Sequence, residues 1–300
     1  MANDDYQPGT LSSQSVGLRI GIVSDYHMPY RCSALPAALF ESLQGADLLL
    51  HAGDVGELWV LDRLSDIAPV IAVHGNDDSA EAQRELPYRQ LIHARGQRIL
   101  LWHGHYRKRQ EEMAARQGDA FLPKLDRLAA GAEGAGAGIV VFGHWHIPLV
   151  YRHADALLIN PGAIASGSAT TRQLRQTAAA LFLDDDATPH LSHIDLANPG
   201  FSYVPQIDWE AGFSAALAQF SASILAPDLA AKVPRLRALL DPELEADLVP
   251  RLQPLAEKCW LGEFDEITAE MVLDALQDVP AIGASLMSEI RETLAPPLSQ

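Results

Sequence analysis

Six short runs of branched apolar residues recur over the first 160 positions, and each leads into a turn with glycine, aspartate or histidine. Such runs, bounded by turn residues, are typical of buried strands. The segments 34–44 and 58–67 space their apolar residues as helices do. Strands that alternate with helices favour an α/β core with polar loops at the strand ends. The predicted strands are LRIGIVS (18–24), DLLLHAG (47–53), PVIAVHG (69–75), QRILLWHG (97–104), GIVVFGH (138–144) and ALLINPG (156–162), with TAAALFLDD (177–185) as a seventh.

The sequence pattern changes near residue 200. Residues 201–300 hold 16 acidic and 6 basic residues, no catalytic motif, and four segments with apolar side chains at helical spacing. We therefore expect a disordered lead-in at 1–16, a core at 17–200 and a helical appendage at 201–300. The glycine- and alanine-rich stretch 129–138 predicts a flexible connection inside the core. The four apolar faces are Phe213, Leu217, Phe220 and Ile224; Leu229, Val233, Leu236 and Leu240; Leu244, Leu248, Leu252 and Leu255; and Ile282, Leu286 and Ile290.

Charge and cysteine content exclude several classes of protein. A formal net charge of -17 and a pI near 4.9 argue against a nucleic-acid-binding surface, because phosphate backbones would be repelled. Cys32 and Cys259 form neither a disulfide framework nor a thiolate zinc motif. The first residues lack the apolar centre of a secretory signal, and no apolar run approaches the roughly 20 residues that span a bilayer. The sequence predicts a soluble, cytoplasmic protein without a membrane partner.

Carboxylate and imidazole side chains follow the predicted strands. In GHWHIP, His144 and His146 are two positions apart, so both rings lie on the same side of an extended segment, as they would in a metal site. A polar turn is the alternative interpretation. Asp25 and His27 repeat this spacing. Carboxylates, imidazoles and one carboxamide without a thiolate suit Mn, Fe, Zn, Ni or Co better than calcium. The other strand ends contribute Asp54, Asn76, His103 and His105.

The ordered series D-x-H, G-D, G-N, H-G-H and G-H-x-H resembles the calcineurin-like metallophosphoesterase superfamily. Over about 17–185 the pattern is similar to its compact bacterial and archaeal phosphodiesterase branch, of the YfcE/MJ type; the retromer scaffold subunit shares that fold. The resemblance implies a four-layer αββα sandwich, to which this chain adds the C-terminal helical appendage. It also implies a phosphoric ester hydrolase with a dinuclear centre of two divalent transition-metal ions, for example manganese.

The resemblance assigns a role to each ligand. Asp25, His27 and His146 would hold one ion, and Asn76, His103 and His144 the other, with Asp54 bridging the two. In the implied reaction, a hydroxide held between the ions attacks the phosphorus of a small phosphorylated substrate in line.

One position departs from many relatives, which have a histidine directly after the motif asparagine to assist the leaving group. This chain has Asp77 there, followed by Asp78. Without that histidine we expect phosphodiesters to be the favoured substrates, with phosphomonoesters left open. His105 and Asp77 are the candidates for the general acid. Asp78 resembles an aspartate of this branch, which would orient His103 or another ligand through a hydrogen bond on the side away from the metal.

Other polar and aromatic residues allow two interpretations each. His51 and His74 are either packed core histidines or site residues. The run Arg107–Arg109 is either a solvated charged segment or a grip for a second phosphate. Trp145 either packs against the sheet or offers a wall on which a nucleobase stacks. Asn160, in NPG, resembles a structural turn near the site.

An alternative function comes from another class of protein. A catalytically vestigial scaffold or protein-binding module would keep the fold and act through the helical appendage. A vestigial site should have lost ligands, whereas every expected position is filled here, so the sequence favours the enzyme. The amphipathic helices of the appendage also fit a dimerisation element, which would give a homo-oligomer, or a cap that limits substrate size.

Overall fold

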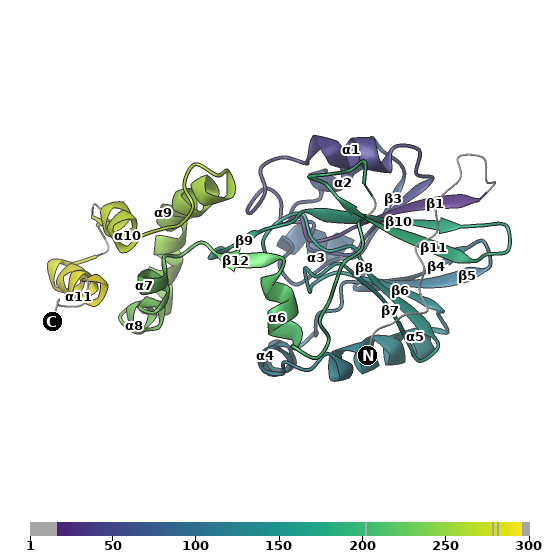
Figure 1. Ribbon diagram of the computed structural model, residues 1–300. Coiled ribbons are helices and arrows are strands. Elements are labelled where there is room, and N and C mark those ends of the chain that lie inside the picture. Colours follow the sequence, from purple (N-terminus) through teal and green to yellow (C-terminus); the bar gives the residue numbers. More distant parts are fainter. Residues whose placement is uncertain (1–16, 202, 278, 281, 296–300) are drawn as a thin grey trace. The chain divides into compact units, whose positions relative to one another are not determined.

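The computed structural model describes residues 17–201, 203–277, 279–280 and 282–295 (Figure 1). The predicted lead-in at 1–16 lies outside these residues. The described residues form two compact units, one within 17–167 and 173–221, the other within 168–172 and 222–295. The first unit contains all the candidate ligands.

Two five-stranded sheets make up the centre of the first unit. The first has the order β11-β10-β1-β2-β3, with β1, β2 and β3 parallel and β10 antiparallel to β1. The second has the order β4-β5-β6-β8-β7, with β5, β6 and β8 parallel. Because the parallel strands run the same way, their C-terminal ends, which carry the candidate ligands, meet at one edge of each sheet. The strands are β1 (Leu18–Val23), β2 (Leu48–His51), β3 (Val70–Ala72), β4 (Arg89–Ala94), β5 (Gln97–Trp102), β6 (Ile139–Phe142), β7 (Leu149–His153), β8 (Ala156–Asn160), β10 (Thr177–Leu183) and β11 (Pro189–Asp195); β9 (Thr171–Gln173) pairs with β12 (Ser221–Ser223).

Alternating side chains on these strands build three apolar layers. Ile20 of the first sheet and Ile99 and Leu101 of the second belong to the core between the sheets. Leu100 and Trp102, on the opposite face, pack with α5, while α1 and α2 cover the outer face of the first sheet (Figure 1). This arrangement confirms the predicted four-layer αββα sandwich. The helices of this unit are α1 (Ala37–Leu43), α2 (Trp59–Leu64), α3 (Ala80–Glu85), α4 (Arg109–Gln117), α5 (Leu122–Ala135) and α6 (Phe213–Ala218).

Three strands of the sandwich escaped prediction, and all three lie at sheet edges. They are β4, β7 and β11. Each mixes polar and apolar residues, as in PHLSHID of β11, whose side chains alternate between partly exposed and buried toward its end. Edge strands of this kind lack the continuous apolar run that identifies a strand covered on both faces.

The stretch 129–138 is not the flexible connection expected from its glycines, because residues 122–135 form α5. A Cβ at Gly131 would lie 2.9 Å from the ring of Trp102, so glycine lets the helix approach the sheet closely. Gly136, with φ 59°, ends the helix in the left-handed region. The sequence signal for flexibility therefore reflects close packing and a helix end.

The second unit contains α7 (Pro227–Ala230), α8 (Val233–Ala238), α9 (Pro242–Trp260), α10 (Ala269–Leu276) and α11 (Ala284–Leu294). Their apolar faces meet in one cluster that includes Leu229, Leu248 and Ile290. Residues 201–221 fall in the first unit and not in an appendage that starts at 201. The apolar face expected over 213–224 is also divided, because α6 ends at Ala218 and Phe220 packs with the core cluster around Trp145.

Candidate metal centre

Five candidate ligands have a positive φ, a backbone conformation that residues other than glycine rarely adopt. Asp25, His27, Asp54, His144 and His146 have φ values of 57°, 48°, 53°, 69° and 56°. Each such residue costs about 1–3 kcal/mol and persists only where the surrounding structure holds it. Backbone hydrogen bonds hold these loops here, since the N–H groups of Asp25 and His27 donate to the carbonyls of Gly53 and Asp54 at 3.0 and 2.9 Å. Strain concentrated at one cluster of side chains indicates a functional site.

Glycines let the strand-end loops approach one another. Gly53 has φ 92°, and a Cβ there would lie 2.7 Å from Nδ1 of His103. A Cβ at Gly143 would overlap the Ser24 hydroxyl and lie 2.8 Å from Oδ2 of Asp25. The loops that contain Gly53 and Gly143 can therefore pack closely against the candidate ligands.

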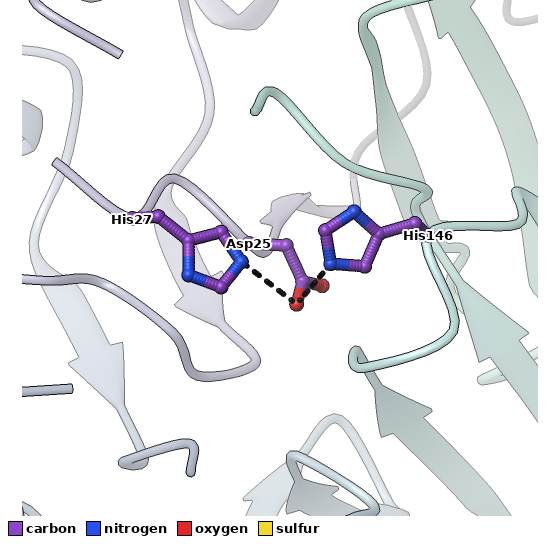
Figure 2. Close-up of side chains that lie close together, drawn as sticks. All are labelled: Asp25, His27 and His146. Atoms are coloured by element: carbon purple, nitrogen blue, oxygen red, sulfur yellow. Dashed lines mark ion pairs between the residues drawn. The ribbon is translucent and has the colours of Figure 1, made fainter. Parts of the chain in front are cut away.

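Asp25, His27 and His146 form what we term the first ligand group. Nε2 of His146 lies 3.1 Å from Oδ1 of Asp25, and Nε2 of His27 lies 4.0 Å from the same oxygen. Figure 2 shows the carboxylate between the two imidazole rings. The rings are stacked with their centroids 5.5 Å apart, and all three side chains are buried. Their ligand atoms lie close enough together to hold one metal ion.

Asp54, His103 and His144 form the second ligand group. Nε2 of His103 lies 3.1 Å from Oδ2 of Asp54, and Nε2 of His27 in the first group lies 3.7 Å from that same oxygen. Asp54 therefore faces both groups. The structure thus brings together, in two neighbouring sets, six of the seven residues predicted as ligands.

Unpartnered atoms fit a metal at this place. Among the described residues, Nε2 of His27, Nε2 of His103 and Oδ1 of Asn76 are buried without a hydrogen-bond partner. Buried polar atoms are rarely left this way, so each unpaired atom calls for an explanation. Asn76, the seventh predicted ligand, directly precedes Asp77, whose N–H donates to Oδ1 of Asp54 at 2.8 Å. A mixed set of nitrogen and oxygen donors without sulfur suits divalent transition metals.

The buried charges of the site shift one another's pKa values. Burial opposes ionisation of Asp25 and Asp54, but neighbouring histidines outweigh it and hold the pKa of each carboxyl well below its usual range. Burial lowers the pKa of His27 to about 4. Burial also disfavours a charged His103, yet the adjacent Asp54 carboxylate raises the pKa of that ring well above its ordinary value. The site therefore holds two buried carboxylates that need positive partners, which a divalent cation would supply.

Asp78 joins the loops that carry Asp54 and Asn76. Its two carboxylate oxygens accept the backbone N–H groups of Gly56 and Gly75, both at 2.6 Å. Burial, with the nearby charge of Asp54, raises the pKa of Asp78 to about 6. Asp78 is thus a loop brace, and it has no direct hydrogen bond to His103 among the bonds found for the described residues.

The two candidates for the general acid lie in different surroundings. Asp77 is exposed and makes an ion pair with Arg31, whose Nη2 lies 3.0 Å from Oδ2 of Asp77. His105 is buried, with its ring 5.3 Å from that of His103. Burial is the larger effect and the charge of His103 the smaller, and together they lower the pKa of His105 to about 3. The His105 ring is therefore neutral near pH 7. This weakens His105 as a proton donor.

Three residues at the site were not predicted from the sequence. The Ser24 hydroxyl donates to Oδ2 of Asp25 at 2.6 Å. Arg31 places Nη1 3.2 Å from Nδ1 of His27. Glu112, on α4, lies 2.8 Å from Nε2 of His144, and the hydrogen bond and charge of that ring hold the pKa of Glu112 low against the opposing effect of burial. Only the adjacency of Ser24 to Asp25 gave any local signal.

The open interpretations resolve toward packing. Trp145 is buried and packs edge-on against Phe142 and Phe213, so it forms no wall for a nucleobase. Asn160 donates to the Gly143 carbonyl at 2.9 Å, which ties the end of β8 to the GHWH turn. His51 is fully buried and accepts the Gly53 N–H through Nδ1.

His74 and the basic run also have partners in the fold. His74 lies 2.9 Å, through Nδ1, from the Gly75 carbonyl. In the run 107–109, Arg107 is exposed with its guanidinium over the Tyr88 ring, and Lys108 pairs with Glu111. These contacts fit a solvated segment and do not indicate a binding site for a second phosphate.

Residues 18–186 match the family model of the calcineurin-like phosphoesterase superfamily domain. The chain belongs to this superfamily. The match spans more than half of the chain and includes every candidate ligand, from Asp25 to His146. Membership supports a hydrolase of phosphoric esters and agrees with the clusters of residues able to hold metal.

Two relatives and one solved structure illustrate the likeness. A "probable metallophosphoesterase" of Methanocaldococcus jannaschii is 34% identical over 146 residues, which is 48% of this chain and 67% of that protein. Phosphodiesterase YfcE of Escherichia coli K12 is 29% identical over 168 residues, 49% of this chain and 80% of that protein. Vacuolar Protein Sorting 29 from Cryptosporidium parvum is 20% identical with a TM-score of 0.46, over 62% of this chain and 99% of its own. Within the described part of the chain, no helix is both long and apolar enough to cross a membrane.

Proposed function

We propose that this protein is a phosphodiesterase that works with two divalent transition-metal ions on a small phosphorylated substrate. The observation that carries the proposal is the pair of ligand groups around Asp54, whose Oδ2 lies 3.7 Å from Nε2 of His27 and 3.1 Å from Nε2 of His103. A single ion would need only one such group. Two neighbouring groups that share a carboxylate match the arrangement used for in-line displacement at phosphorus.

Residues of the chain would hold the ions as the sequence predicts: Asp25, His27 and His146 one ion, Asn76, His103 and His144 the other, with Asp54 between them. When bound, such ions make a water nucleophile available near neutral pH and offset the charge that develops on phosphate oxygens. Mn, Fe, Zn, Ni and Co all suit these donors. Asp78 would keep the two loops of the second group at a fixed separation.

Arg31 adds a cation beside the site in a chain of net charge -17. Its guanidinium reaches from His27 to Asp77 and is one-fifth exposed. A guanidinium with donors to spare is suited to bind a phosphate oxygen. We assign Arg31 to substrate binding, where it would offset the repulsion between an anionic substrate and the surrounding carboxylates.

Phosphodiesters are the preferred substrates in this proposal. The position that supplies a leaving-group histidine in many superfamily members is Asp77, which is exposed and paired with Arg31. A leaving group that departs as a stabilised alkoxide or phenoxide needs less help from an acid. Neither candidate is set up as a proton donor, since burial keeps His105 neutral and the Asp77 carboxylate is paired with Arg31.

Hydrolysis of bis-p-nitrophenyl phosphate and p-nitrophenyl phosphate tests the proposal. Protein stripped of metal is refilled in turn with Mn²⁺, Ni²⁺, Zn²⁺ or Fe²⁺, with Asp54→Asn as the control. We expect metal-dependent turnover of the diester that the control lacks. Faster turnover of the monoester would keep the enzyme and reverse the substrate preference, and bound metal without turnover of either would favour the scaffold function instead.

The predictions of a cytoplasmic location, of no nucleic-acid partner and of a homo-oligomer formed through the helical unit stay predictions. Light scattering of the full chain and of a variant without residues 222–300 would test the last, because an unchanged oligomeric state would exclude the helices as the dimerisation element.

A further inference from the structure

Glu112 is a buried acidic residue on α4 for which neither the motifs nor the proposed reaction has a use. Its side chain is about one-tenth exposed, against about half for its neighbour Glu111. Burying a carboxylate is costly unless hydrogen bonds or charges compensate it. Glu112 must therefore have strong partners inside the fold.

Three donors surround the Glu112 carboxylate. Oε1 lies 2.8 Å from Nε2 of His144 and 2.9 Å from Nε of Arg116, and Oε2 accepts the backbone N–H of Tyr106 at 2.9 Å. Arginine and a backbone amide can only donate, so both oxygens act as acceptors, as in an ionised carboxylate.

The contact with His144 selects one ring nitrogen. Because an ionised carboxylate only accepts hydrogen bonds, Nε2 of His144 must carry a proton, and in the neutral ring Nδ1 then keeps the lone pair. His103 has the opposite arrangement: its Nδ1 lies 2.7 Å from the Ala52 carbonyl and donates to it, which leaves Nε2 toward Asp54. The two histidines of the second ligand group therefore present different ring atoms.

We propose that Glu112 is a positioning residue that holds His144 in the Nε2–H tautomer with Nδ1 toward the second ion, and so sets the affinity for that ion. The inference rests on the proposed dinuclear centre. A carboxylate behind a metal-bound histidine fixes the ring and increases the basicity of its other nitrogen, and its loss typically costs 10–100-fold in metal affinity.

Calorimetric titration of metal-free protein with Zn²⁺ tests the consequence. Glu112→Gln keeps the shape of the side chain and removes its charge, while Glu111→Gln makes the same change on the exposed side of the same helix. We expect Glu112→Gln to weaken one of two Zn²⁺ binding events by roughly tenfold or more and to leave the other unchanged. Glu111→Gln should match the wild type. Two unchanged binding events in Glu112→Gln would overturn the proposal.

The tautomer can be observed without any variant. Nitrogen-15 NMR of the metal-free wild-type protein distinguishes a protonated from an unprotonated ring nitrogen, with His144→Gln identifying the signal. We expect Nε2 of His144 to be protonated and its Nδ1 to be unprotonated. An Nδ1–H tautomer at His144 would overturn the proposal even if Glu112→Gln failed to fold. Failure of the wild type to bind two ions would contradict the proposed function instead, so the two failures are distinct.

Discussion

The two ligand groups use the same kinds of residue but are held by different means. In the first group the carboxylate is anchored: Oδ2 of Asp25 accepts the Ser24 hydroxyl at 2.6 Å and the His144 N–H at 3.0 Å. In the second group both imidazoles have a partner behind them, the Ala52 carbonyl for His103 and Glu112 for His144, and Oδ1 of Asp54 accepts the Asp77 N–H at 2.8 Å. The first pair of rings, His27 and His146, is stacked, and of their two Nδ1 atoms only that of His27 has a polar partner among the described residues, Nη1 of Arg31 at 3.2 Å.

This difference shows that neighbouring metal sites can be adjusted separately. A substitution of Ser24, which contacts Asp25, should act on the first group, and one of Glu112, which contacts His144, should act on the second. Asp54, which lies close to a histidine of each group, is the exception that should affect both. The following predictions test how far the two groups are independent, beginning with the residue they share.

Asp54→Asn should have the largest effect. We expect a loss of metal-dependent diester turnover of at least about 100-fold, because the substitution weakens both groups at once. Zn²⁺ content measured by mass spectrometry should fall below one ion per chain, whereas Asp25→Asn should retain one. Equal Zn²⁺ content in the two variants would mean that Asp54 is not shared.

His193 lies outside both ligand groups and should make the fold sensitive to acid. Its effect on stability must be separated from the effect of the ligand residues. Burial lowers the pKa of His193, on β11, to about 4, against about 6.5 in the unfolded chain. As the pH falls from 6.5 toward 4 the unfolded chain binds the proton first, so stability present above pH 6.5 is lost, by about 2 kcal/mol between pH 7 and pH 4.5. In urea denaturation at pH 7 and pH 4.5, His193→Gln should lose that much less than the wild type. Equal losses in the two proteins would exclude His193 as the cause.

Asp78→Asn should affect the second group through its loops. An asparagine offers one acceptor to the N–H groups of Gly56 and Gly75, so one of these buried donors loses its partner. We expect the free energy of unfolding to fall by about 1–3 kcal/mol in urea denaturation. The exposed Asp62→Asn on α2 is the control and should change little. A normal stability for Asp78→Asn would remove Asp78 as the loop brace.

Ser24→Ala should have the smallest effect and should act on the first group alone. Loss of the hydrogen bond to Asp25 should weaken one Zn²⁺ binding event by roughly tenfold, as expected for a partner behind a ligand. Ser42→Ala on α1, whose hydroxyl donates to the Ala38 carbonyl, serves as the control. Calorimetric titration that showed both binding events weakened would contradict the independence of the groups.

Much of the fold could be predicted because strands covered on both faces leave a continuous apolar run. The edge strands β4, β7 and β11 were missed because polar residues interrupt their apolar ones. The helix α5 was missed because Gly131 and Gly134 normally indicate flexibility. At Gly131 the close approach of Trp102 explains the glycine, whereas at Gly134 no atom would lie within 4 Å of a Cβ.

The sequence by itself determined the order of the motifs along the chain, the superfamily, and which side chains follow the predicted strands. Apolar periodicity and motif spacing are local properties, so they can be read without the tertiary structure. Only the tertiary structure decided which ring nitrogens of His144 and His103 meet a partner within the fold, and which residue that partner is. Glu112 is 32 residues from His144 in the chain, and Ala52 is 51 residues from His103. A hydrogen bond over such a separation depends on how the sheets and α4 pack, and no local pattern records it.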